Sequence, residues 1–162
     1  MPEQDGPAAP APRAPLASTE SGVVTVHEAG DGPYSQDIVA GNYVIRADEP
    51  VSVGGHGTGP TPHELLLAAL GGCTAITLRM YADRKKWPLE NVSVRLTHDR
   101  IHAEDCKNCE TKAGYVDRIR RDITLEGPLD AGQKARLLEI ADKCPVHRTL
   151  MSEKVIETRL TA

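Results

Sequence analysis

The feature that most constrains the fold is an apolar run from Leu65 to Leu78, inside the stretch PTPHELLLAALGGCTAITLRM. Only two glycines and two threonines interrupt these 14 residues. As a helix the run would be about 21 Å long, short of the roughly 30 Å of a bilayer core. We therefore expect a buried core helix and no membrane span.

A helix start signal stands directly before this run. Thr61 fits the N-cap position, Pro62 the first helical position and Glu64 the third, which together make a capping box. The helix is predicted from Pro62 to about Lys85, where a Trp-Pro pair ends it. Because the helix is apolar nearly all round, it needs cover on every side. A dimer partner would supply cover that one small subunit lacks.

Alternating patterns predict strands in two groups. The runs VVTV, YSQDIVA and NYVIRA predict three short strands within residues 22–48, separated by GDGP and AGN. Residues 91–103 and 115–125 predict an antiparallel pair, in which the Arg and Asp residues of the second strand lie on a solvated outer face. Residues 154–161 predict a last strand.

A second helix is predicted after Asp130, which fits the N-cap position with Gln133 three residues later. Pro145 is expected to stop this helix. Its predicted core face consists of Leu137, Ile140, Ala141 and Cys144. Two groups of strands around two helices, one of them wholly apolar, predict an α+β fold.

Composition limits the class of protein. Residues 1–20 are rich in Pro and Ala and predict a disordered tail, so the folded domain is expected to span 21–162. The N-terminus lacks the features of a secretory signal, and we expect a cytoplasmic protein. The net charge of −4 gives no reason to expect a nucleic acid or a membrane as partner. With no Phe and one Trp, the core must be aliphatic.

Cys73 follows the double glycine on the apolar helix. A buried inert thiol and a reactive nucleophile fit this placement about equally well. Gly71 and Gly72 each cost roughly 1 kcal/mol of helix stability relative to Ala, which indicates a close backbone approach or room for a ligand. Cys144 lies 71 residues later, also on an apolar face. Two such cysteines can meet in space.

A cysteine pair of this kind permits a specific redox chemistry. One thiolate attacks a peroxide oxygen and becomes a sulfenic acid, and a second thiol then condenses with it to a disulfide. The attacking thiol needs a nearby Arg or Lys, because burial alone raises the pKa of a thiol.

The stretch GPTPHELLLAALGGCTAITLRMYADRKKWPLENVSVRLTH, followed downstream by ADKCPVHRTL, resembles the OsmC/Ohr family of thiol peroxidases. The resemblance covers about residues 22–162. It implies an intertwined homodimer, in which two central helices pack between antiparallel sheets from both subunits. It also implies that Cys73 is the peroxidatic cysteine and Cys144 the resolving one. The expected reaction is reduction of organic hydroperoxides by a lipoyl-type or thioredoxin-like dithiol, with no bound cofactor.

The sequence departs from the family at the acidic residue that holds the catalytic arginine. Family members place a Glu directly after the helix-start proline, whereas this chain has His63 there and Glu64 one position later. Glu64 fits the supporting role and the capping-box role about equally.

The catalytic cation is the second departure, because the family's Gly-rich arginine motif is not found. Arg46 is the only Arg between Arg13 and Arg79, which makes it the default candidate. A solvated strand residue is the slightly favoured alternative for Arg46. Arg79 lies about 120° around the helix from Cys73 and is not expected to reach it. Arg148 is another candidate cation.

A second cysteine pair, Cys106-Lys-Asn-Cys109, is not part of the family's common pattern. This spacing suits a redox disulfide or half of a zinc site, for which His98 and His102 are the nearest further ligands. Two plain surface-loop cysteines are the remaining alternative. One hypothesis is that this pair relays electrons to or from the Cys73–Cys144 centre.

Three functions therefore stay open. Both central cysteines favour a peroxidase, and the aliphatic core favours bulky apolar hydroperoxides as substrates. The His63-Glu64 order and the absent arginine motif favour a non-catalytic redox-sensing or small-molecule-binding protein on the same scaffold. A zinc-dependent structural module would rest on His102, Cys106 and Cys109 alone.

Overall fold

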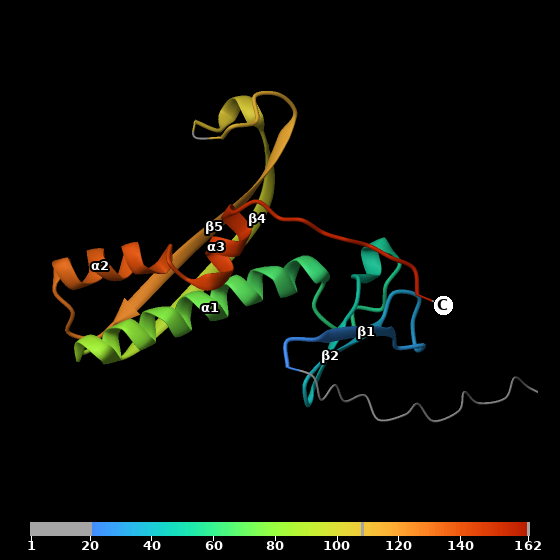
Figure 1. Ribbon diagram of the computed structural model, residues 1–162, viewed down its shortest axis with the longest axis horizontal. Coiled ribbons are helices and arrows are strands. Elements are labelled where there is room, and N and C mark those ends of the chain that lie inside the picture. The colour runs from blue at the N-terminus through green and yellow to red at the C-terminus, as the bar shows by residue number, and fades with distance from the viewer. Residues whose placement is uncertain (1–20, 108, 162) are drawn as a thin grey trace, which may run out of the picture. The chain divides into compact units, whose positions relative to one another are not determined.

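The computed structural model describes residues 21–107 and 109–161, and the predicted disordered tail at 1–20 lies outside the described residues. The chain divides after Pro62 into two compact units, which are described separately here. Helices and antiparallel sheets are both present, which confirms the predicted α+β class (Figure 1).

The first unit contains a three-stranded antiparallel sheet in the order β1-β2-β3. Its pairing runs from Val24↔Ala40 to Glu28↔Gln36 between the first two strands. All three strands that the alternating pattern predicted are confirmed. The elements of this unit are β1 (Val24–Glu28), β2 (Gln36–Ala40), β3 (Tyr43–Ala47) and the 3-10 turn η1 (Val51–Val53).

Asp48 organises the glycine-rich loop that follows β3. Its side chain is buried and accepts hydrogen bonds from the backbone N–H groups of Glu49, His56 and Thr58 and from the Thr58 hydroxyl. Burial pushes the pKa of Asp48 upward, but these donors, with Thr58 foremost, outweigh burial and lower the pKa to about 2. The loop is therefore held by one ionised carboxylate.

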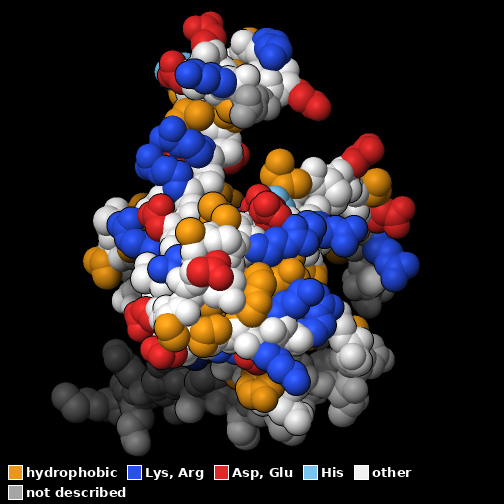
Figure 2. All heavy atoms as spheres, turned by 90° about the vertical axis from the view of Figure 1, so that its left-hand side faces the viewer, with side chains coloured by type: hydrophobic (Ala, Val, Ile, Leu, Met, Phe, Trp, Pro, Cys, Tyr) orange, Lys and Arg blue, Asp and Glu red, His pale blue; other side chains and the backbone are white. Residues whose placement is uncertain are grey.

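The second unit packs helices against a long β-hairpin. Strands β4 and β5 pair antiparallel over their full length, from Asn91↔Glu126 to His102↔Tyr115. The tip of this hairpin projects beyond the helices of the unit (Figures 1 and 2). The elements are α1 (Pro62–Lys85), β4 (Asn91–His102), η2 (Ala103–Asp105), β5 (Tyr115–Glu126), α2 (Ala131–Ala141) and α3 (Pro145–Met151).

The core of the second unit lies between α1, α2 and the hairpin. The predicted capping box forms between Asp130 and Gln133. Leu137, Ile140 and Ala141 of the predicted face are buried on α2, but Cys144 is buried beyond the end of this helix, as the N-cap residue of α3. As the composition required, the core is aliphatic. Its buried members are Leu78, Ala82, Leu89, Leu129, Leu137, Ile140 and Ala141.

Two sequence-based expectations about the C-terminal region are wrong. Pro145 does not stop α2, which has already ended at Ala141, but begins α3, because a proline lacks only an N–H that the first helical position leaves unpaired anyway. Residues 154–161 form no strand, since a strand requires a hydrogen-bonded neighbour and the described chain offers them none. Val155 and Leu160 are consequently 83% and 100% exposed.

Helix α1 has the predicted bounds, but the described residues of the second unit cover only one of its faces. In the described residues α1 is the one helix long and apolar enough to cross a membrane, a test that core helices of soluble proteins also pass. Its packing against β4 and α2 is that of a core helix. Only 22% of its most apolar stretch is buried among the described residues, so they do not cover the helix on every side.

Candidate functional site

Cys144 and Thr74 meet in the interior of the second unit, although they lie 70 residues apart. Both side chains are fully buried, and the Thr74 Oγ1 lies 3.7 Å from the Cys144 Sγ. The Thr74 hydroxyl donates to the Leu70 carbonyl oxygen at 2.8 Å. Because that bond uses its only proton, the hydroxyl is left to accept from the Cys144 thiol. The Cys144 Sγ also accepts a hydrogen bond from the His147 backbone N–H at 3.3 Å, so contacts from two helices hold this sulfur in place.

Arg121 completes this buried cluster and was missed by the sequence analysis. Its guanidinium donates to the Thr74 Oγ1 at 3.0 Å, to the Ala141 carbonyl oxygen at 3.2 Å and to the Asp142 carboxylate at 2.6 Å. The Arg121 side chain is only 13% exposed. One arginine thus joins β5, α1 and the C-terminal end of α2 directly beside Cys144.

The prediction that the Arg residues of this strand face solvent is wrong for Arg121. It pairs with Leu96 of β4, whose side chain packs against α1, so both residues point to the inner face. The period of two in a strand places Arg121 in line with Ile119 and Ile123. That alternation was the signal available in the sequence.

Cys73 directly precedes Thr74 and is a half-buried free cysteine. It belongs to a stripe along α1 that we call the exposed stripe, with members spaced three and four residues apart. Ile76 and Met80 of this stripe are 61% and 67% exposed. The exposed stripe consists of Leu66, Ala69, Cys73, Ile76 and Met80. Cys73 is accessible and lies in an apolar surface.

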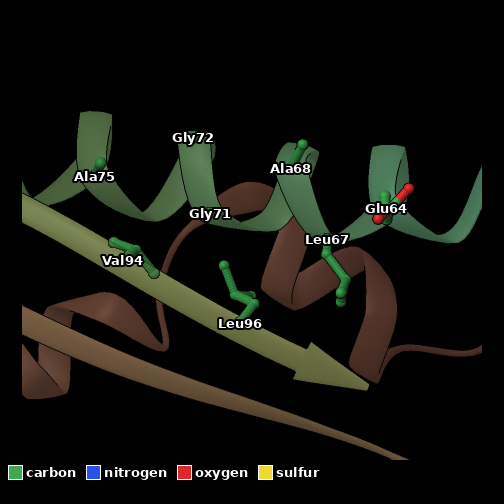
Figure 3. Close-up of a pocket in the computed structure, with 8 residues that line it drawn as sticks. All are labelled: Glu64, Leu67, Ala68, Gly71, Gly72, Ala75, Val94 and Leu96. Atoms are coloured by element: carbon green, nitrogen blue, oxygen red, sulfur yellow. The ribbon is translucent and has the colours of Figure 1, made fainter. Parts of the chain in front are cut away.

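A groove of about 440 Å³ runs between α1 and β4 (Figure 3). It does not include Cys73: at about 100° per residue, its helix positions fall on the opposite half of α1 from the thiol. Its lining residues are Glu64, Leu67, Ala68, Gly71, Gly72, Ala75, Val94 and Leu96. The groove contains no thiol, so the candidate redox chemistry lies with Cys73 on the other side of α1.

The two glycines before Cys73 have different reasons to be glycine. A Cβ at Gly71 would lie 2.8 Å from a terminal methyl of Leu96, so this residue lets α1 approach β4 closely. A Cβ at Gly72 would meet nothing within 4 Å, and this residue opens onto the groove. The predicted close approach therefore applies to Gly71, whereas the open space at Gly72 belongs to a groove that does not include Cys73, so room for a ligand beside the thiol stays a prediction.

Glu64 and Cys73 are not brought together within one chain. Nine helical residues separate them, which is about 13.5 Å along the axis, and Glu64 faces the groove. His63, at the family's Glu position, stacks on His98 with ring centroids 5.2 Å apart. The His98 Nε2 lies 2.9 Å from an Asp117 carboxylate oxygen.

Arg46 lies in the first unit, where two carboxylates use its donors. It donates to Asp37 at 2.8 Å and to Asp31 at 2.7 Å. The hydrogen bond from Arg46 lowers the pKa of Asp31. These contacts fit the role of a paired strand residue, and a catalytic role for Arg46 stays a prediction.

The other two candidate cations lie in the second unit. Arg79 donates to the backbone carbonyl oxygens of Leu89 and Glu90, so its head group holds the turn after α1 instead of approaching Cys73. Arg148 is exposed on α3.

The second cysteine pair is a disulfide at the hairpin tip, with the Cα atoms of Cys106 and Cys109 5.5 Å apart. Sulfurs joined in this way are not thiolate ligands for zinc. His102 packs its ring against Tyr115, with centroids 4.3 Å apart. Among residues 21–107 and 109–161, no three His, Cys, Asp or Glu residues gather in a metal-binding group.

Comparison with known proteins identifies the family. A sequence model of the OsmC-like proteins matches residues 55–159, which is more than half of the chain. The chain therefore belongs to the OsmC-like family. No curated protein sequence gives a significant match.

Solved structures show the same fold at low sequence identity. An OsmC-like protein from Mycoplasma pneumoniae aligns with a TM-score of 0.63 and 19% identity, over 82% of this chain and 89% of that one. An organic hydroperoxide resistance protein from Legionella pneumophila aligns with a TM-score of 0.58 and 19% identity, over 83% of this chain and 91% of that one. The organic hydroperoxide resistance protein OhrB of Bacillus subtilis aligns with a TM-score of 0.54 and 16% identity, over 83% of this chain and 93% of that one.

Proposed function

We propose that this chain is a cysteine-based peroxidase that reduces organic hydroperoxides, with Cys73 as the attacking thiol and Cys144 as the resolving thiol. One observation carries the proposal: the residue next to Cys73 contacts the Cys144 sulfur at 3.7 Å. An accessible thiol and a buried thiol are thereby held at the same turn of α1. The names of the Legionella and Bacillus proteins support the substrate class.

The proposed reaction has three steps. The Cys73 thiolate attacks one peroxide oxygen, the O–O bond breaks, and the departing alkoxide takes a proton to leave as an alcohol. Cys73 is then a sulfenic acid. The Cys144 thiol attacks its sulfur, water leaves, and a Cys73–Cys144 disulfide forms. An external dithiol returns two electrons and two protons, which regenerates both thiols.

We also propose that the enzyme is a homodimer assembled on the exposed stripe. A stripe with alternating spacings of three and four residues is the pattern that packs one helix against another. Residues 154–161 carry exposed apolar side chains and have no strand neighbour in the described chain, so a second copy supplies their missing partner. A supporting role for Glu64 at the thiol stays a prediction, because within one chain Glu64 lies about 13.5 Å along α1 from Cys73 and faces the groove.

The dimer proposal can be tested by introducing a negative charge into the exposed stripe. Ile76→Glu places a carboxylate in the exposed stripe, and we expect a monomer in analytical ultracentrifugation with an unchanged far-UV circular dichroism spectrum. Leu138→Glu is the matched control, because Leu138 is also 61% exposed but lies on α2. A dimer that survives Ile76→Glu would refute the exposed stripe as the interface.

The proposed reductant is a lipoyl-type or thioredoxin-like dithiol, and the proposed compartment is the cytoplasm. Both follow from the chemistry, because a disulfide formed in each turnover requires a pool of reducing thiols. Apolar substrates are favoured since the exposed stripe surrounds Cys73 with Leu, Ala, Ile and Met.

A second candidate is a redox-sensing or small-molecule-binding protein without efficient turnover. The observation that favours it is the pairing of Arg46 with Asp31 and Asp37, which leaves the thiol without an assigned cation.

Steady-state assays with cumene hydroperoxide and dihydrolipoamide separate the two candidate functions. A peroxidase turns over many equivalents and loses turnover in Cys73→Ser, and a sensor is oxidised once. Hydrogen peroxide serves as the comparison substrate, and we expect it to be reduced at least tenfold more slowly than cumene hydroperoxide.

A further inference from the structure

The disulfide at the tip of the β4–β5 hairpin has no role in the peroxide chemistry described above. Cys106 and Cys109 lie in the segment that leads from η2 back towards β5. This tip stands clear of the helices of its unit and carries charges of both signs (Figure 2). Cys106 and Cys109 are each half-buried, so part of the disulfide is accessible to other molecules.

The hairpin does not need this disulfide to close. Beyond the last strand pair, the Ala103 N–H donates to the Gly114 carbonyl oxygen at 2.9 Å, and Cys106 N–H donates to Ala103 at 3.1 Å. The rings of His102 and Tyr115 pack across the two strands at the same level. A disulfide stabilises by closing a loop, and the gain grows with loop length. The loop closed by Cys106 and Cys109 has four residues, so the stabilisation expected from this disulfide is small.

The tip is also too far from the buried cysteine to react with it in the same chain. Leu96 lies opposite Arg121, which reaches the Cys144 cluster, and six strand residues separate Leu96 from His102. At about 3.3 Å per residue this is about 20 Å before η2 is added. Thiol–disulfide exchange requires direct contact between sulfurs. A direct relay within one chain is therefore not available in this structure.

We propose that Cys106 and Cys109 form a second redox centre, which exchanges two electrons with an external dithiol. A thiolate of that dithiol attacks one sulfur, and the other leaves as a thiolate that takes up a proton. The second thiol of the donor then attacks the mixed disulfide. One S–S bond breaks in the protein and one forms in the donor, with two electrons and two protons transferred. The reverse reaction reoxidises the tip.

Local charge favours this exchange. The Lys112 ammonium donates to the Cys109 carbonyl oxygen at 2.9 Å, which fixes a positive charge beside the loop. A neighbouring cation stabilises the thiolate that must leave. The surrounding Lys107 and Glu110 side chains are exposed, so the approach to the sulfurs is polar, in contrast to the apolar surface around Cys73.

The test uses the full chain carrying Cys73→Ser and Cys144→Ser, in which the tip holds the only cysteines. The folded protein is equilibrated with mixtures of dihydrolipoamide and lipoamide, and separately with a thioredoxin-type protein dithiol. Alkylation and intact mass then count the free thiols. We expect reversible reduction from zero to two thiols, with half-reduction at a donor ratio within about a thousandfold of unity. The faster donor identifies the source of the dithiol.

Three results would overturn the proposal. The disulfide resists both donors until the protein is unfolded, the reduced tip binds one zinc ion and no longer reoxidises with lipoamide, or the Cys106→Ser/Cys109→Ser variant melts more than about 8 °C below wild type. The last result would mark a structural crosslink. Because Cys73 and Cys144 are absent from the test protein, its outcome is independent of the proposed peroxidase.

Discussion

The two faces of α1 differ in what the chain does with them. One face carries Leu70, Thr74 and Leu78, which are buried against the hairpin, α2 and the Cys144 cluster. The other face, the exposed stripe, holds Cys73 among apolar side chains that nothing in the second unit covers. The first face therefore stabilises the fold of the subunit. The second is the face that we propose for assembly and chemistry, and that proposal would account for a helix that is apolar nearly all round.

The largest expected effect is the difference in unfolding free energy between shortening a side chain on the buried face of α1 and shortening one on the exposed stripe. Leu78→Ala removes a side chain with no exposed surface and is expected to cost about 2–5 kcal/mol of unfolding free energy. Met80→Ala, on the exposed stripe, should cost less than about 0.5 kcal/mol at concentrations low enough to dissociate the proposed dimer. Urea unfolding at several protein concentrations measures both. Equal losses at low concentration would contradict the comparison.

Arg121 joins the buried face of α1 to β5 and α2, and its removal is expected to be the next largest effect. Arg121→Gln should destabilise the protein by about 1–3 kcal/mol, because the Thr74 hydroxyl and the end of α2 lose a buried donor. Arg120→Gln is the control, since Arg120 is 57% exposed and contacts Asp99 at 3.4 Å. A neutral Arg121→Gln variant would show that the cluster does not support the fold.

Gly71 and Gly72 allow the same comparison of a packed and an open position within a single turn of α1. Gly72→Ala should stabilise the helix by up to about 1 kcal/mol, because the new methyl group meets open space. Gly71→Ala should gain less or lose, since its methyl group displaces the end of Leu96. Thermal unfolding of both variants gives the difference. A larger gain at Gly71 would contradict the close packing of α1 on β4.

Asp48 gives an expected effect with a defined sign as the pH is changed. Its folded pKa of about 2 lies below the usual 3.8, so its contribution to stability is complete above about pH 4 and is lost as the pH falls towards 2. The melting temperature of wild type should therefore exceed that of Asp48→Asn at pH 5. The difference should shrink between pH 4 and pH 2. A constant difference over that range would contradict an ionised Asp48.

Much of the fold could be predicted from local chemistry. Capping residues and apolar runs predicted helices α1 and α2. Alternation of apolar and polar residues predicted the strands that pair with another strand in the described chain. The strand predicted at 154–161 failed because its partner is not in the described chain, and Pro145 was misread because proline both ends and begins helices. Local patterns do not contain the partner of a strand.

The candidate site was less predictable, because it depends on residues far apart in sequence. Cys144 was placed correctly on a core-facing position, but nothing near it in sequence indicated Thr74 or Arg121. A charged residue in an apolar alternation looks like a surface residue until its partners are known. The assignment of Cys73 and Cys144 as a reacting pair rests on the resemblance to the OsmC/Ohr proteins and stays a prediction.

The most direct test of the proposed peroxidase is a single-turnover disulfide map. The reduced protein is treated with one equivalent of cumene hydroperoxide, digested under non-reducing conditions and analysed by mass spectrometry. We predict a Cys73–Cys144 disulfide, lost in Cys73→Ser and replaced by a Cys73 sulfenic acid in Cys144→Ser. If Cys73 stays a free thiol while Cys106 and Cys109 oxidise, Cys73 is packing material in α1, and the redox chemistry of this protein belongs to the hairpin tip alone.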